Sequence, residues 1–303
     1  GFLMAMINLI IRIVFLILLV ITISIVTVYS FYPSVNSANN ESQKYALLIG
    51  GGVTELDTYD SFFKNIEYAS NALIKLGYQE EDIKILFYGG QKPNRSIVAK
   101  NATKQILLDE LSHLENTIDS NDSLVIFRTG HGTIDLVFEN HETLSNIEHA
   151  HAFDRFKCVG TTSVMRFPDG VLSCREFQKS LARIKAKQIV IILNQCFSEQ
   201  FGEIALKLDN TVVISQTGLA IRQTRETIRW KHDEWPFVKC LFDGFLHMGT
   251  KGEKHTNYNA FQYMHKCNPN IEGIPIQPDH PLLKENPQIR YGRSLKKGAV
   301  YIH

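Results

Sequence analysis

Apolar positions in the first half of the chain follow two periods, one typical of strands and one typical of helices. Residues 45–49 and 83–88 are short apolar runs that predict buried strands. Between them, apolar side chains recur at steps of four and three and stop at Gly77, which predicts an amphipathic helix that ends at this glycine. A second stripe predicts another helix. The first stripe consists of Phe62, Ile66, Ala69, Leu73 and Leu76, and the second of Leu107, Leu111 and Leu114.

The second half continues the alternation of strand and helix. Residues 123–132 and 188–198 each begin with a β-branched, apolar run of strand length, and Thr211–Ser215 is a third. Ser173 and Glu176 have the pattern of a capping box at the start of a helix before the second of these strands. A last helix is expected on Val238, Leu241, Phe242 and Phe245. Strands that are apolar throughout need cover on both faces, so the pattern predicts an α/β fold with a mostly parallel sheet and helices on both faces.

The N-terminal segment differs from the rest of the chain. Residues 14–32 form a run of 19 residues without a charge, long enough to cross a bilayer, and Arg12 precedes the run. We expect an uncleaved membrane anchor; a cleaved signal peptide and a buried core helix are the alternatives, although a core helix should show a polar face. With Arg12 on one side and Lys44 on the other, the catalytic part is expected to be extracytoplasmic, or secreted if the segment is cleaved.

Three parts are therefore expected along the chain. Residues 1–32 form the hydrophobic anchor or signal segment, residues 33–43 are a polar linker rich in Ser and Asn, and residues 44–303 form the folded domain. The net charge of +1 gives no electrostatic bias toward nucleic acid, and none is expected as a partner.

Two of the predicted strands end on reactive side chains. His131 follows the strand in 123–132, and Cys196 follows the strand in 188–198. The carboxyl ends of neighbouring parallel strands meet at one edge of a sheet, where ligands bind in folds of this class. A free thiol is only a few per cent ionised at neutral pH, so a cysteine nucleophile needs a nearby imidazole to take its proton. The pair therefore predicts a thiol nucleophile with its base.

These motifs carry a family resemblance. Thr-Gly-His-Gly after one strand and Gln-Cys-Phe-Ser after a later one, with an insertion and a helix between them, resemble the caspase-like cysteine peptidases, the group of caspases, metacaspases, legumains and gingipains. The resemblance covers about residues 45–291, and the Asp169-Gly170 turn before the helix agrees with it. It implies a caspase-like α/β/α sandwich.

The resemblance also implies roles for individual residues. Cys196 is the nucleophile, His131 transfers protons, and the backbone N–H groups of Gly132 and Cys196 stabilise the oxyanion. Four residues are expected to bind substrate: Asn194, Ser215, Gln216 and Thr217. Because metacaspases and legumains carry an acidic residue where this chain has Asn194, a preference for basic substrates does not follow. Family members commonly have glycine at the position of Glu199, so a turn with positive φ is expected to be lost there.

The expected activity is that of a cysteine endopeptidase that hydrolyses polypeptides through a thioester, without a cofactor. Two alternatives remain: a catalytically inactive caspase-like domain that binds peptides or supports assembly, and a related transpeptidase or amidase. The insertion after His131 is rich in His and Glu, but its spacing matches no strong metal motif, and we expect no metal.

Five cysteines leave the redox state open. If Cys196 is reduced, the other four allow two disulfides, but four reduced thiols are the favoured expectation. These four are Cys158, Cys174, Cys240 and Cys267.

Overall fold

The computed structural model describes residues 42–90, 99–134, 163–216, 236–248, 256–268 and 287–295, and Ile17. The chain divides into two compact units, residues 1–41 and residues 42–303. Within the described residues, no helix has both the length and the apolar character needed to span a bilayer. The apolar run at 14–32, apart from Ile17, lies outside them, so the anchor remains a prediction.

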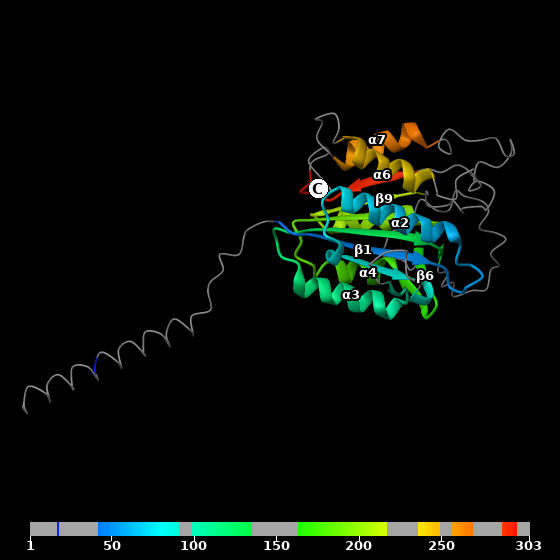
Figure 1. Ribbon diagram of the computed structural model, residues 1–303, viewed down its shortest axis with the longest axis horizontal. Helices are drawn as coiled ribbons and strands as arrows, with labels where there is room; N and C mark the ends of the chain where they lie inside the picture. Colours follow the sequence, from blue (N-terminus) through cyan, green and yellow to red (C-terminus); the bar gives the residue numbers. More distant parts are fainter. Residues whose placement is uncertain are drawn as a thin grey trace, which may run out of the picture. The chain divides into compact units, whose positions relative to one another are not determined.

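Seven strands of the described region form one sheet in the order β10-β9-β8-β4-β1-β2-β3 (Figure 1). The six strands from β9 to β3 are parallel, and β10 pairs with β9 in the antiparallel direction. The strands are β1 (Lys44–Gly51), β2 (Ile83–Phe87), β3 (Lys100–Asn101), β4 (Ser123–Gly130), β8 (Gln188–Asn194), β9 (Thr211–Ser215) and β10 (Gln288–Tyr291). The expectation of a mostly parallel sheet is confirmed.

Helices cover both faces of this sheet (Figure 1). One face packs against α2 (Asp60–Lys75), α6 (Pro236–Met248) and α7 (Asn257–Cys267). The other packs against α3 (Lys104–Thr117), α4 (Cys174–Leu181) and α5 (Glu203–Lys207). Short 3-10 turns in the described residues connect elements: η1 (Glu80–Asp82), η2 (Tyr88–Gly90) and η5 (Ser198–Gly202).

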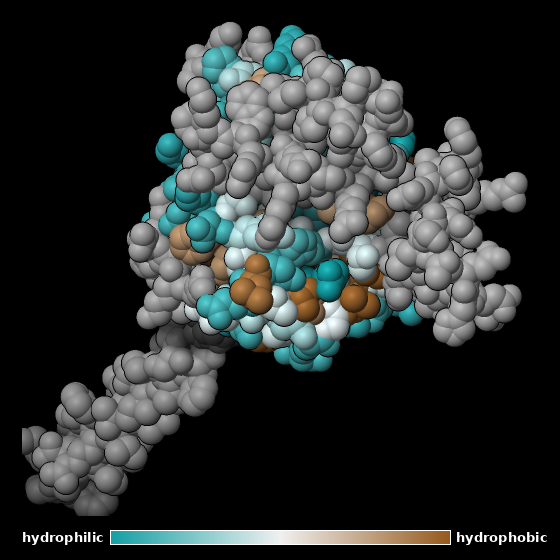
Figure 2. All heavy atoms as spheres, turned by 90° about the vertical axis from the view of Figure 1, so that its right-hand side faces the viewer, coloured by the Kyte–Doolittle hydropathy of each residue, from teal (hydrophilic) through white to brown (hydrophobic). Residues whose placement is uncertain are grey.

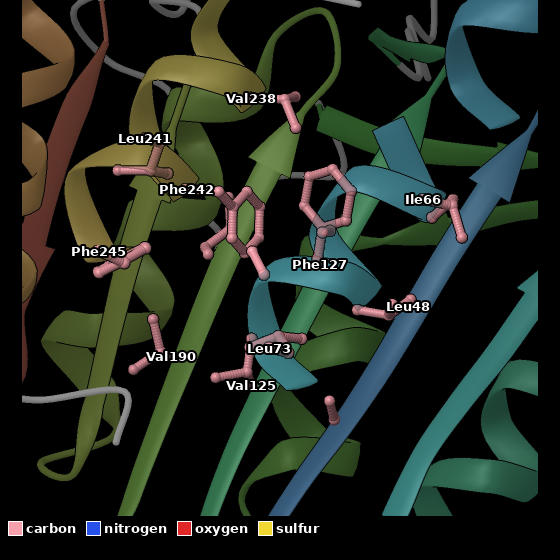
Figure 3. Close-up of a cluster of buried hydrophobic side chains, with 14 of the residues drawn as sticks. Leu48, Ile66, Leu73, Val125, Phe127, Val190, Val238, Leu241, Phe242 and Phe245 are labelled. Atoms are coloured by element: carbon pink, nitrogen blue, oxygen red, sulfur yellow. The ribbon is translucent and has the colours of Figure 1, made fainter. Parts of the chain in front are cut away.

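The central strands are buried on both sides, which explains their continuous apolar sequence. Along β1, Leu48 faces the core shared with α2 and α6, whereas Leu47 and Ile49 face the core on the α3 side. Figure 3 shows the first core, where Phe127 of β4 meets Phe242 of α6 edge to face, with ring centroids 5.5 Å apart. Aromatic pairs of this kind add to the area burial that dominates folding.

A second, three-stranded sheet of order β5-β6-β7 was not anticipated from the sequence. It consists of β5 (Gly132–Ile134), β6 (Ser163–Phe167) and β7 (Gly170–Ser173), and all its pairs are antiparallel. The expected Asp169-Gly170 turn joins β6 to β7. With three residues, β5 is too short for a pattern of apolar positions to be recognised in the sequence. Because β5 begins at Gly132, this small sheet lies directly beside the predicted site.

Candidate active site

The register of the sheet brings the two reactive residues to the same level. Partners across β4 and β8 differ by 65 in residue number throughout, as Thr129 and Asn194 do, and His131 and Cys196 differ by the same 65. His131 lies two positions beyond Thr129, and Cys196 lies two positions beyond its partner Asn194. Both residues therefore lie just beyond the carboxyl ends of adjacent strands, and the ring of His131 contacts Phe62 of α2.

The loops that carry the pair are in direct contact. A methyl group placed on Gly132 would lie 2.2 Å from the carbonyl oxygen of Cys196 and 2.9 Å from Nε2 of Gln195. Real atoms do not approach so closely, so only glycine fits between these backbones. Gly132, the residue after His131, therefore contacts Cys196 directly.

The imidazole of His131 is held by the loop after β1. Its Nε2 lies 2.9 Å from the carbonyl oxygen of Asp57. A carbonyl oxygen only accepts hydrogen bonds, so Nε2 carries the hydrogen and Nδ1 of the neutral ring is left as an acceptor. The rings of Tyr59 and Phe62 pack edge to face on the imidazole, with centroids 5.3 Å and 5.4 Å away. The ring is thus fixed in tautomer and orientation.

Burial sets the protonation state of His131. Loss of solvent lowers the pKa of this imidazole below its ordinary value, and the hydrogen bond to the Asp57 carbonyl, which raises the pKa, offsets this only in part. The nearby cations Arg128 and Arg166 lower the pKa further. At neutral pH the ring is therefore uncharged and able to accept a proton.

The role of Asp57 was not identified from the sequence. Its backbone carbonyl is presented by a tight loop in which Thr54 N–H donates to Oδ1 of Asp57 (2.6 Å) and Gly52 N–H donates to the hydroxyl of Thr58 (3.0 Å). A backbone carbonyl has no side-chain signature; the only signal was the run of glycines after the first strand, which permits a tight turn.

Cys196 is not disulfide-bonded and is 9% exposed. The chain turns sharply after it, because Phe197 adopts left-handed geometry with φ 55° and ψ 32°. The backbone has no positive φ at Glu199: within the described region Phe197 is the single non-glycine residue with positive φ, and Glu199 lies inside η5. There its carboxylate pairs with Arg290, 3.4 Å away.

Beneath the pair lies a row of uncharged polar side chains. Nδ2 of Asn194 and Nδ2 of Asn65 both donate to the hydroxyl oxygen of Thr129, at 3.0 Å and 3.1 Å. All three residues are fully buried. Just after β9, the backbone N–H of Gln216 donates to the carbonyl oxygen of Leu193 (3.0 Å). The network fixes the ends of three neighbouring strands relative to α2.

The expected substrate-binding residues lie at this edge but are enclosed. Asn194 and Gln216 are 0% exposed and Ser215 is 2% exposed. Thr217 lies outside the described residues. The described part of the group forms the floor under His131 and Cys196, and its contact with substrate stays a prediction.

The favoured expectation of four reduced cysteines is wrong. Cys240 of α6 and Cys267 of α7 form a disulfide, and Cys174 is also disulfide-bonded. Within the described residues, no cluster of three or more potential ligands could hold a metal ion. The His-rich part of the insertion, residues 139–151, lies outside them.

Seen toward the edge where the parallel strands end, the described surface carries hydrophilic and hydrophobic residues side by side (Figure 2). Leu56, in the loop that presents Asp57, is 92% exposed.

Comparison with known proteins gives information on the fold alone. No family model matches the chain, and no curated protein matches it. Among solved structures, the chain is similar to the crystal structure of protein GSU0716 from Geobacter sulfurreducens, with a TM-score of 0.53 and 12% identity, over 86% of this chain and 99% of the other. The α/β architecture described above is therefore shared with a known bacterial protein.

Proposed function

We propose that this chain is a caspase-like cysteine endopeptidase in which Cys196 is the nucleophile and His131 its base. The observation that carries the proposal is the common register of the two residues on β4 and β8, together with the contact of Gly132 against the Cys196 backbone. A neutral, oriented imidazole beside a reduced cysteine is the arrangement that thiol proteases require.

The chemistry follows from these positions. Nδ1 of His131 accepts the thiol proton, and the sulfur of Cys196 attacks the substrate carbonyl carbon, forming a C–S bond while the carbonyl π electrons move to oxygen. The oxyanion collapses, the C–N bond breaks, and the imidazolium gives its proton to the leaving amine. Water, deprotonated by the same ring, then cleaves the thioester and releases the acid and the thiol.

The backbone beside the pair supports an oxyanion site. Arg166 N–H donates to the His131 carbonyl (3.2 Å), so Gly132 and Met165 form a non-hydrogen-bonded pair of the β5–β6 ladder. The N–H of Gly132 therefore points away from β6. A backbone donor of this kind is worth about 3–4 kcal/mol when it meets a developing oxyanion.

We further propose that the catalytic domain is extracytoplasmic and tethered through residues 14–32. The disulfide between Cys240 and Cys267, and the disulfide at Cys174, support an oxidising compartment. The length of the uncharged run supports the tether.

The test is turnover of a fluorogenic peptide library by the full chain and its variants. Cys196→Ala and His131→Ala are expected to reduce kcat/KM to the level without enzyme, whereas His113→Ala, which removes an exposed histidine of α3, is expected to retain activity. Equal turnover by all four proteins would rule out the proposed chemistry.

The same experiment separates the alternatives. Peptides that bind the parent chain without being cut would indicate an inactive binding domain. Products that carry an added amine at the new carboxyl end, detected by mass spectrometry, would indicate a transpeptidase.

A further inference from the structure

Arg128 of β4 is a buried cation next to the proposed site. It is 1% exposed, and its guanidinium lies over the ring of Phe167, with 4.6 Å between the carbon of the guanidinium and the ring centroid. None of the ion pairs in the described part of the chain includes it. Nη2 donates instead to two backbone carbonyls, those of Arg166 (2.8 Å) and His131 (3.4 Å).

The second carbonyl belongs to the peptide group that carries the N–H of Gly132. The structure contains no cis peptide among its described residues, and in a trans peptide the C=O and the following N–H point in opposite directions. Donors from Arg128 and from Arg166 N–H hold the carbonyl oxygen on one side. The Gly132 N–H is consequently held on the other side, at the free edge of the described part of the small sheet, where β5 is the outer strand.

We propose that Arg128 is a positioning residue that acts through the His131–Gly132 peptide to orient and polarise the oxyanion donor. The inference rests on the proposed peptidase function, because it concerns the same reaction. A positive charge at the oxygen end of a peptide draws electron density toward that end and makes the N–H a stronger donor, an effect that is largest where solvent is excluded.

The chemistry of the guanidinium fits this task. Nη2 donates to both carbonyls while the planar, delocalised guanidinium lies on the ring of Phe167. Burial lowers the pKa of Arg128 to about 9, which leaves the group charged at neutral pH. A buried cation without a carboxylate partner costs stability, and an apolar side chain of similar size is often tolerated in its place. The position of this costly group next to His131 points to a role in the site.

The test compares Arg128→Met and Arg128→Lys with the parent chain, with Arg183→Met as a control at an exposed position just after α4. We expect Arg128→Met to lower kcat by about 10- to 100-fold, less than the loss of a whole donor, with KM unchanged. Arg128→Lys should restore part of this loss, and the control should match the parent. A change in KM together with the fall in kcat, or an unchanged kcat, would overturn the proposal.

Inhibitors give a readout that a merely structural role would not move. A peptide aldehyde forms a thiohemiacetal whose oxygen occupies the oxyanion position, whereas the corresponding peptide alcohol does not. In Arg128→Met the Ki of the aldehyde should rise by the same factor as kcat falls, and the Ki of the alcohol should stay constant. Equal changes for both inhibitors would show that Arg128 only supports the fold.

Failure of this proposal and failure of the proposed function can be told apart. If the parent chain cleaves no peptide, the peptidase function is wrong, and Arg128 is then judged by NMR on glycine-labelled protein. The Gly132 amide proton should move upfield in Arg128→Met and stay in place in Arg183→Met. An unmoved Gly132 resonance would disprove polarisation by Arg128 whatever the activity.

Discussion

Gly132 has no room for a side chain larger than hydrogen. Gly132→Ala would bring its Cβ into the carbonyl of Cys196, and a backbone atom cannot yield as a side chain can. We expect kcat/KM to fall by more than about 100-fold, because both the cysteine loop and the oxyanion donor are displaced. Steady-state kinetics on the variant measure this.

Gly89→Asn is the matched control. Gly89 has φ 69° and open space around its Cβ position, and asparagine tolerates the left-handed region. Its activity should equal that of the parent. If Gly132→Ala were as active as this control, the close contact with Cys196 would have no catalytic role.

His131 should give the reaction a pH dependence with a defined sign. The ring must be neutral to accept the thiol proton, and burial lowers its pKa, so kcat/KM should be lost only as pH falls through this lowered pKa. Tyr59→Ala removes an aromatic contact and admits water. The acid limb of the kcat/KM profile should then move to higher pH. An acid limb that does not move would show that Tyr59 does not contribute to the burial that lowers the pKa.

The same shift links His131 to stability. An imidazole whose pKa is lowered in the folded state binds fewer protons than in the unfolded chain. Its contribution to the free energy of unfolding is therefore fully present above the unfolded pKa and decreases as pH falls from there toward the folded pKa. Acid should weaken the site and the fold together.

Helix α4 is fixed at its start by the capping box that the sequence predicted. The hydroxyl of Ser173 accepts from Glu176 N–H (3.2 Å), and Oε2 of Glu176 accepts from Ser173 N–H (3.0 Å). Ser173→Ala should lower the free energy of unfolding by about 1 kcal/mol, measured by urea denaturation. Ser112→Ala, on the exposed face of α3, should change it little. Equal effects of the two variants would contradict a capping role.

The sequence predicted the longer elements of the fold but not the shortest ones. The main strands and helices have long periodic patterns, and Thr211–Ser215 was placed to the residue. The small sheet next to the site was not predicted, because β5 has three residues and the strand with which it pairs, β6, lies far along the chain. The contact of Asp57 with His131 was missed because it uses the backbone carbonyl of Asp57, and the contacts of Arg128 were missed because its partners are backbone carbonyls; backbone groups leave no residue-type signature.

The disulfide between Cys240 and Cys267 connects two helices of the whole domain. The cysteines are 27 positions apart, and closing a loop of this length stabilises a fold by about 3–4 kcal/mol when only chain entropy is counted. Cys240→Ser with Cys267→Ser should lower the free energy of unfolding by an amount of this order. The measurement is a urea titration without reductant. An unchanged midpoint would show that the bridge does not stabilise the domain.

The register of β4 and β8 sets the relative height of His131 and Cys196 whatever the number of residues that connect the two strands. Residues inserted or deleted between Ile134 and Ser163 alter the numerical distance from His131 to Cys196 but leave both at the same rung, since the ladder alone fixes their height. One residue added between Asn194 and Cys196 would instead move the sulfur one position further from the paired end of β8. Evolution of such a scaffold is thus free to vary the excursions between strands, while the two-residue extensions beyond Thr129 and Asn194 must keep their length.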